Sequence, residues 1–375
     1  MIYDMVLEEL KDRKAYLYEK YSPFYTISFA VHNFNIMNRK RRIYYEGKKI
    51  LNARLPILFV SPAGFMKSYY LTNMAGDKDV GIFNNAGMKV GYEQSMTEAG
   101  LVGTLGKDGF GEQRSIPGAA EIYKDGLMLV DEFSGITQAM KSTTNNQMDS
   151  QLLTILDGGH VVKRLACGMH EFDTSVTLWT GVQPAKIDMA SGLGRRFCYM
   201  LFMPTRKDNK MIMQARHNAK NIQPDPTEML KINNMNKSFI ASLNTIERVN
   251  YPDEVLTLYE KMGIFSFEAA LYDQLILGYN LAKFGAKKKI DLVINDELKG
   301  LLTLEKEWRL EINLGVDLGL MKNMIRILGG KTNTQMLAAE CTMVGWNAEQ
   351  MNSVLNDMQR YNMISRVGNK VELAK

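Results

Sequence analysis

LPILFVSPAGFMKSYYL (55–71) is the stretch of this 375-residue sequence that decides its predicted fold class. Residues 55–60 form a continuous apolar run short enough for a buried strand, and the turn that follows leads into a helix. This order of strand, loop and helix is what a phosphate-binding loop requires, because backbone N–H groups at a helix start attract phosphate oxygens. Lys67 would then reach the terminal phosphates, and the Ser68 hydroxyl would bind Mg²⁺.

The loop matches the usual GxxxxGK[ST] pattern poorly. Ser61 and Met66 replace its two glycines, and only Gly64 lies inside the loop. Taken alone, a Lys-Ser pair after a strand arises by chance as readily as it does in a nucleotide site. The residues predicted to surround a bound nucleotide are Ser61, Pro62, Ala63, Gly64, Phe65, Met66, Lys67 and Ser68, together with Asp131.

A carboxylate pair further along the chain favours the nucleotide site. Asp131 and Glu132 end the apolar run in GLMLVDEF (126–133), so they emerge at the carboxyl edge of a predicted buried strand. Open α/β sheets bind ligands at that edge. Asp131 is suited to hold Mg²⁺, and Glu132 is suited to polarise an attacking water. The alternative is an acidic pair that only caps the next helix.

The rest of the chain completes an α/β pattern. Two more apolar runs, at 174–182 and 197–204, predict strands of a parallel sheet covered by helices on both faces. Residues 5–20 predict an amphipathic helix, whereas the aromatic segment 21–38 indicates no single type of element. The polar segment 206–235 is interpreted as a linker, and the segment 238–328 as helical without clear strands.

The C-terminal residues differ from the rest. Two predicted helices and a β-hairpin around Gly368 and Asn369 are typical of a winged helix-turn-helix. Near the other end, the basic stretch from Arg39 to Lys49 is interpreted as a solvated connector.

Composition excludes several classes of protein. Three dispersed cysteines form neither a disulfide framework nor a zinc ribbon. No apolar run reaches eighteen residues, and the charged N-terminus is unlike a signal peptide, so we expect a soluble cytoplasmic chain without a membrane partner. The net charge of +5 does not by itself indicate nucleic acid.

A series of segments in one order resembles the minichromosome maintenance (MCM) family of AAA+ ATPases. SPAGFMKS is similar to that family's Walker A segment, and PGAAEIYKDGLMLVDEF (117–133) is similar to its Walker B stretch, which is the most specific match. The remaining matches are SMTEAGLVGTL (95–105), the pre-sensor hairpin in LLTILDGGHVVKRLACG (152–168), the sensor 1 strand WTGVQP (179–184), the arginine-finger segment GLGRRFCYMLF (192–202) and the lid helix DLGLMKNMIRIL (317–328).

The resemblance implies roles for residues outside the loop. Glu132 and the sensor amide Gln183 would act in catalysis, together with Arg196, the finger that reaches a neighbouring subunit's ATP. Arg195 is the second choice for the finger. Lys163 and Arg164 on the pre-sensor hairpin, and Lys107 at the start of the insertion KDGFG (107–111), would contact DNA in a central channel; the alternative is a set of solvated hairpin charges.

The resemblance also implies a division of the chain. It predicts a short helical and basic segment (1–45), an AAA+ P-loop core (46–235), a helical lid (236–328) and a winged helix (331–375). Two features depart from the family. Gly319 falls where the sensor 2 arginine is expected, unless Lys322 or Arg326 substitutes, and the segment before the core is too short for the family's N-terminal domain. We expect such a form from a virus, a plasmid or an integrated element.

The function implied is that of an ATP- and Mg²⁺-dependent DNA helicase or translocase acting on single-stranded or forked DNA. A finger in trans implies a homo-oligomeric ring, hexameric by analogy, with replication proteins as further partners. The alternative is an ATP-driven switch that remodels DNA or loads other proteins on it without unwinding.

Overall fold

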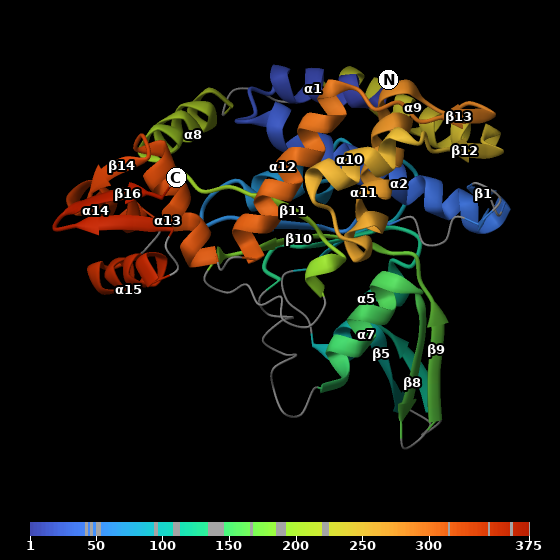
Figure 1. Cartoon of the computed structure of the whole chain (residues 1–375). Helices are drawn as coiled ribbons and strands as arrows, with labels where there is room; N and C mark the ends of the chain where they lie inside the picture. The colour runs from blue at the N-terminus through green and yellow to red at the C-terminus, as the bar shows by residue number, and fades with distance from the viewer. Residues whose placement is uncertain are drawn as a thin grey trace.

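A five-stranded parallel sheet lies at the centre of the molecule (Figure 1). The computed structural model describes residues 1–41, 44–45, 48–49, 54–93, 97–107, 113–133, 146–165, 168–184, 193–219, 225–313, 316–343, 346–360 and 363–374. The sheet contains, in spatial order, β11 (Cys198–Leu201), β3 (Ile57–Val60), β10 (Thr177–Val182), β7 (Leu127–Val130) and β4 (Val90–Glu93).

Four of these strands confirm the predictions made from apolar runs. Every residue of β3, β7, β10 and β11 is buried, as expected for strands covered on both faces. The fifth strand, β4, lies at the edge of the sheet and is only partly buried, so its sequence VGYE contains no apolar run. The structure is therefore a mixed α/β fold with a parallel sheet.

The N-terminal residues belong to the core. The predicted helix 5–20 is instead divided into α1 (Ile2–Asp12) and the beginning of α2 (Tyr18–Arg41), and Lys14 and Leu17 between them have positive φ angles of 53° and 54°. The aromatic segment 21–38 is the buried part of α2. It packs against α11 (Ser266–Phe284) and the sheet. Tyr21 of this segment also stacks on Trp308 of α12 (Asp296–Asn313), with ring centroids 5.5 Å apart.

Two β-hairpins form a lobe on one side of the sheet (Figure 1). One hairpin is β5 (Gly103–Lys107) with β6 (Gln113–Pro117), and the other is β8 (His160–Leu165) with β9 (Gly168–Asp173). A helix followed by a hairpin was predicted within 152–168, but the second strand of the hairpin extends beyond that range to Asp173. The short helices α4 (Glu98–Val102) and α5 (Ala119–Ile122) and the longer α7 (Asn146–Asp157) complete the lobe.

The segment interpreted as a linker is helical in its described part, so that prediction was wrong. Residues Arg206–Ala219 form α8, and α9 begins at Pro226 and ends at Ser242. Besides α11, the helices that follow α9 and precede the C-terminal residues are α10 (Glu254–Met262), α12 (Asp296–Asn313) and α13 (Val316–Ile327). Two short strands that were not predicted, β12 (Arg248–Asn250) and β13 (Lys289–Asp291), form a second sheet with β1 (Tyr44–Tyr45) and β2 (Lys48–Lys49).

The C-terminal residues form a small helix-and-sheet unit at one end of the molecule (Figure 1). It contains β14 (Lys331–Asn333), α14 (Thr334–Met343), α15 (Ala348–Arg360) and the hairpin of β15 (Ile364–Val367) with β16 (Lys370–Leu373). The two predicted helices and the hairpin are present, and β14 adds a third antiparallel strand beside β16. Across the described chain, no helix is both long and apolar enough to cross a lipid bilayer.

Candidate nucleotide-binding site

The loop 61–66 connects the end of β3 to α3 (Lys67–Leu71) at the carboxyl edge of the sheet. Lys67 is buried, with 5% of its surface exposed, and its Nζ donates to the carbonyl oxygens of Ser61 at 2.6 Å and Pro62 at 3.1 Å. The Ser61 amide donates to Val182 on β10 at 3.1 Å, which ties the loop to the neighbouring strand. The ammonium group therefore lies at the loop that was predicted to bind phosphate.

Ser68 meets Asp131 although the two residues are 63 positions apart in the chain. The Ser68 hydroxyl donates to Asp131 Oδ1 at 2.7 Å, so the start of α3 and the end of β7 share one hydrogen bond. Hydroxyl and carboxylate oxygens are the ligand atoms that Mg²⁺ prefers in proteins. This donor set fits the ion that the sequence predicted there.

Glu132 and Gln183 form a second pair at the same edge. Gln183 follows β10, and its Nε2 donates to Glu132 Oε2 at 2.8 Å. The other carboxylate oxygen, Oε1, is buried and has no hydrogen-bond partner among the described residues. A buried carboxylate oxygen without a donor is costly, so it is suited to accept a hydrogen bond from a bound water. The strand order places β10 between β3 and β7, and this order brings both pairs together.

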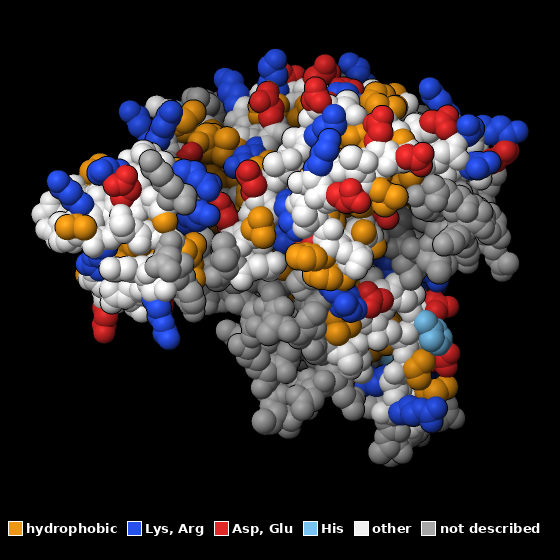
Figure 2. Space-filling model, viewed as in Figure 1, with side chains coloured by type: hydrophobic (Ala, Val, Ile, Leu, Met, Phe, Trp, Pro, Cys, Tyr) orange, Lys and Arg blue, Asp and Glu red, His pale blue; other side chains and the backbone are white. Residues whose placement is uncertain are grey.

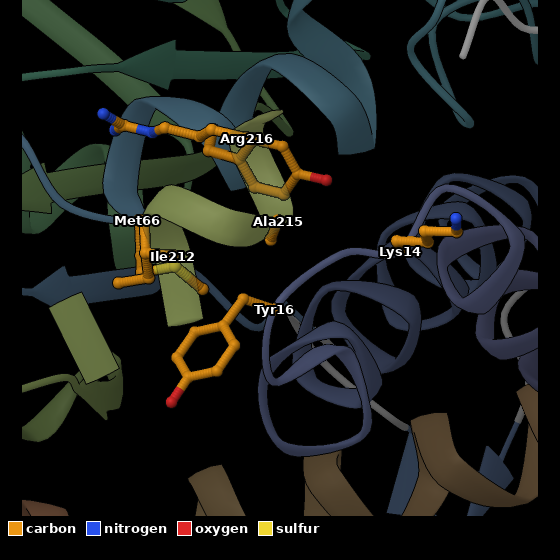
Figure 3. Close-up of a pocket in the computed structure, with 7 residues that line it drawn as sticks. Lys14, Tyr16, Met66, Ile212, Ala215 and Arg216 are labelled. Carbon is orange, nitrogen blue, oxygen red and sulfur yellow. The ribbon is translucent and has the colours of Figure 1, made fainter. Parts of the chain in front are cut away.

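A cavity of about 260 Å³ adjoins the loop (Figure 3). Its wall is mostly apolar and comes from three parts of the chain: the segment between α1 and α2, the start of α3, and α8. The lining residues are Lys14, Tyr16, Met66, Tyr69, Ile212, Ala215 and Arg216. Figure 3 shows Tyr16, Met66 and Ile212 close together, with Lys14 across the opening. A flat apolar ring with polar edges, such as a nucleobase, suits such a wall.

Arg216 is a site residue that the sequence analysis missed. Its Nη2 donates to the carbonyl oxygen of Gly64 at 2.9 Å, so a cation from α8 lies at the phosphate loop. The signal that could have revealed the helix is the spacing of Met211, Ile212 and Ala215, which repeats at helical intervals.

The two candidate finger arginines lie elsewhere. Arg196 forms a bidentate ion pair with Asp157 at the end of α7, and its Nε donates to Oδ1 at 2.5 Å. Arg195 is exposed. Both arginines line a second cavity of about 480 Å³, which shares no lining residue with the first and also contains Arg54 and Phe267.

The predicted DNA-contact residues do not share one environment. Lys163 is buried between the hairpins, where its Nζ lies 3.0 Å from Glu98 Oε1 and 3.3 Å from the carbonyl oxygen of Gly103. The position is therefore structural, and it does not place the ammonium on the open face of the lobe. Arg164 is exposed on β8. Lys107 ends β5, and the following residues 108–111 lie outside the described residues.

The position expected for a sensor 2 arginine has a steric reason to be glycine. Gly319 lies where α13 approaches the end of α12, and a Cβ atom there would come within 2.5 Å of the carbonyl oxygen of Glu311. Arg326, a possible substitute, lies 3.4 Å from Glu311 Oε1 instead. No protein-family model matches the chain, and no curated protein matches it in sequence.

Proposed function

We propose that this chain is an ATP-hydrolysing AAA+ motor of the MCM type that assembles as a ring and acts on DNA. One observation carries the proposal. Residues of three separate motifs, Ser68 with Asp131 and Glu132 with Gln183, meet by hydrogen bonds of 2.7 Å and 2.8 Å at the edge where parallel sheets bind ligands.

In this proposal each group has a chemical task. Lys67 and the loop amides bind the phosphates, and the nucleobase occupies the cavity beside Tyr16. Ser68 and Asp131 would hold Mg²⁺, which neutralises charge on the phosphates. Glu132 accepts a proton from the attacking water, and Gln183 fixes the orientation of the Glu132 carboxylate. These tasks are positioning and electrostatic stabilisation, which account for most of the catalysis of phosphoryl transfer.

The ring is part of the proposal because Arg196 lines a cavity separate from the base pocket. An arginine that acts on a neighbouring subunit's ATP requires head-to-tail contacts, and such contacts form a ring when the rotation between subunits closes. DNA would pass the hairpin lobe, where Arg164 is exposed on β8. Basic side chains lie near the lower end of the lobe on the face shown in Figure 2, and such groups follow a phosphate backbone without reading its sequence.

A second candidate is a DNA-remodelling or loading switch that hydrolyses ATP slowly without unwinding. The observation that favours it is Gly319, because the close approach of α13 to Glu311 leaves no room for an arginine at the sensor 2 position. The two candidates predict the same ATP site and differ in turnover and in unwinding.

The test is ATP hydrolysis with and without single-stranded DNA, for wild type and Glu132→Gln, beside an unwinding assay on a forked duplex. Loss of a general base lowers the rate by about 10²- to 10⁴-fold, and ATP binding should persist in the variant. Glu93→Gln is the matched control. Glu93 is the last residue of β4, the strand beside β7, and its carboxylate accepts a hydrogen bond from the Tyr123 hydroxyl at 3.3 Å.

The outcomes separate the candidates. DNA-stimulated hydrolysis with unwinding, lost in Glu132→Gln and kept in Glu93→Gln, supports the helicase. Hydrolysis without unwinding supports the switch. A wild-type chain that neither binds nor hydrolyses ATP rules out both.

A further inference from the structure

Arg309 of α12 is buried, and its guanidinium contacts the backbone on both sides of the finger arginines. Nη1 donates to the carbonyl oxygen of Gly194 at 2.8 Å, and Nη2 donates to that of Phe197 at 2.7 Å. The residues between these two carbonyls are Arg195 and Arg196. One side chain from a distant helix thus fixes the path of the segment that carries both candidate fingers.

Glu305, one turn before Arg309 on α12, completes this contact. Its Oε1 accepts from Arg309 Nη2 at 2.6 Å and from the Tyr199 amide at 3.2 Å, and its Oε2 accepts from the Tyr272 hydroxyl at 2.6 Å. Because β11 is an edge strand, the carboxylate supplies a hydrogen-bond acceptor on its open side. Figure 1 shows α12 crossing beside β11.

The choice of residues is informative because a buried ion pair is a poor way to stabilise a fold. Removing two charges from water costs several kcal/mol per ion, and apolar residues of similar volume often serve as well. Glu305 has no measurable exposure, and Arg309 is 2% exposed. What apolar residues cannot supply is a rigid planar fork that donates to two carbonyls at once. Lysine, a single point donor, cannot supply it either.

The charge of the fork is maintained in this setting. Burial lowers the pKa of Arg309, but the Glu305 carboxylate and its hydrogen bond more than reverse that effect, so the pKa is raised overall. The guanidinium also lies over the Tyr199 ring, 4.6 Å from its centroid.

We propose that Arg309 is a positioning residue for the arginine finger: through the carbonyls of Gly194 and Phe197 it sets where Arg196 projects toward a second copy of this chain. The inference rests on the proposed function. It assigns to α12 a role in the ATP site of the neighbouring subunit rather than in the ATP site of its own subunit. Asp157 holds the far end of the Arg196 side chain until the neighbouring subunit is bound.

The test mixes two defective variants. Arg309→Lys should keep its own ATP site but misplace its finger, and a misplacement of about 1 Å costs about 100-fold in turnover. Its affinity for a fluorescent ATP analogue should stay at the wild-type value. Glu132→Gln has the opposite defect, because its finger is intact and its catalytic carboxylate is lost.

In mixed rings the finger of Glu132→Gln serves the ATP site of Arg309→Lys. Hydrolysis by an equal mixture should therefore recover to about a quarter of the wild-type rate, well above the sum of the two variants alone. A mixture that gives only this sum overturns the proposal, as does Arg309→Lys with wild-type turnover. A wild type without ATP turnover would instead contradict the proposed function, so the two failures are distinguishable.

Lys306→Met is the matched control. Lys306 lies on the same helix and forms a similar buried ion pair, with Glu268 at 2.8 Å. Glu268 lies 3.9 Å from Arg309 Nε as well, but the Lys306–Glu268 pair makes no hydrogen bond to the described carbonyls of the finger segment. It should lose thermal stability but keep turnover. If Arg309→Lys does not fold, Glu305→Gln takes its place, because the amide still accepts from Tyr199 while Arg309 loses its counter-charge. The proposal would also be overturned if Glu305→Gln hydrolyses ATP at the wild-type rate, or if its mixture with Glu132→Gln gives only the sum of the two separate rates.

Discussion

At the scale of single residues, the loop 61–66 is contacted by a cation from outside the loop. Arg216 is exposed on α8, yet its guanidinium reaches the Gly64 carbonyl at 2.9 Å and lines the cavity beside the loop. A carbonyl is a weak partner for a guanidinium compared with a phosphate, to which arginine donates two parallel hydrogen bonds. In the proposed ATP site, Arg216 would therefore exchange the carbonyl for a phosphate of the nucleotide.

We expect Arg216→Ala to weaken ATP binding by about tenfold, because a hydrogen bond to a charged group contributes about 1.5 kcal/mol or more. Arg216→Lys should retain part of the affinity through its charge. Met213→Ala on the same helix, where Met213 is 64% exposed, is the neutral control. Titration with a fluorescent ATP analogue measures all three, and equal affinities would show that Arg216 contacts only the loop.

The sequence could predict most of the candidate site at this scale. Lys67, Ser68, Asp131, Glu132 and Gln183 each follow an apolar run that forms a strand, so their place at one sheet edge was predictable. Which side chain pairs with which was not, because that depends on β10 lying between β3 and β7. The contacts of Arg216 and Arg309 gave no sequence signal, since their targets are backbone carbonyls distant in the chain.

At the scale of elements, α2 and α11 pack closely against each other in the core. Gly278 on α11 faces α2, and a Cβ atom at this position would lie 2.5 Å from Val31 Cγ2 and 2.7 Å from the carbonyl oxygen of Ile27. Helix α2 cannot move away freely, because it also packs on the sheet through Tyr25 and Trp179, whose ring centroids are 5.0 Å apart.

We expect Gly278→Ala to lower the free energy of unfolding by about 1–3 kcal/mol, the usual cost of overpacking a core. Gly300→Ala on α12 is the matched control, since a Cβ atom there meets nothing within 4 Å. That change should raise stability by about 0.5–1 kcal/mol, because alanine favours helix interiors over glycine. Urea denaturation measures both, and equal shifts of one sign would contradict the packing argument.

Elements were predictable where one physical pattern dominated. Continuous apolar runs identified β3, β7, β10 and β11, since strands covered on both faces are apolar throughout. The helix α2 was not predicted, because it is buried all round and carries polar residues such as Ser28 and His32 within the core. Its apolar residues therefore show no helical periodicity. The helix α8 was interpreted as a linker for the opposite reason, because its residues are largely polar.

At the scale of the whole molecule, α2 connects parts of the fold that lie far apart in the sequence. The Ser28 hydroxyl donates to the Leu55 carbonyl at 2.6 Å and accepts from the Trp179 indole at 2.7 Å. His32 Nδ1 lies 3.0 Å from Thr177 Oγ1 on β10. Helix α2 is thus joined by buried polar contacts to the segment that leads into β3 and to β10, and loss of α2 should affect both strands.

His32 makes this connection sensitive to pH. Burial lowers the pKa of His32 from 6.5 to about 4 in the folded chain. Between those values the unfolded chain binds a proton that the folded chain does not, so the free energy of unfolding rises with pH in that window. The contribution is complete above about pH 6.5, falls as the pH decreases toward 4, and amounts to about 3 kcal/mol.

We therefore expect wild type to lose more stability than His32→Gln as the pH falls from 6.5 to 4.5, because the variant cannot take up that proton on unfolding. Other groups that titrate in this range affect both proteins equally, so the difference between the two curves isolates His32. His217→Gln, which changes an exposed histidine of α8, should follow the wild-type curve. Urea denaturation across this pH range gives the comparison. Parallel curves for wild type and His32→Gln would mean that His32 takes up its proton in the folded chain, and α2 would then not be packed against β10 as tightly as its burial indicates.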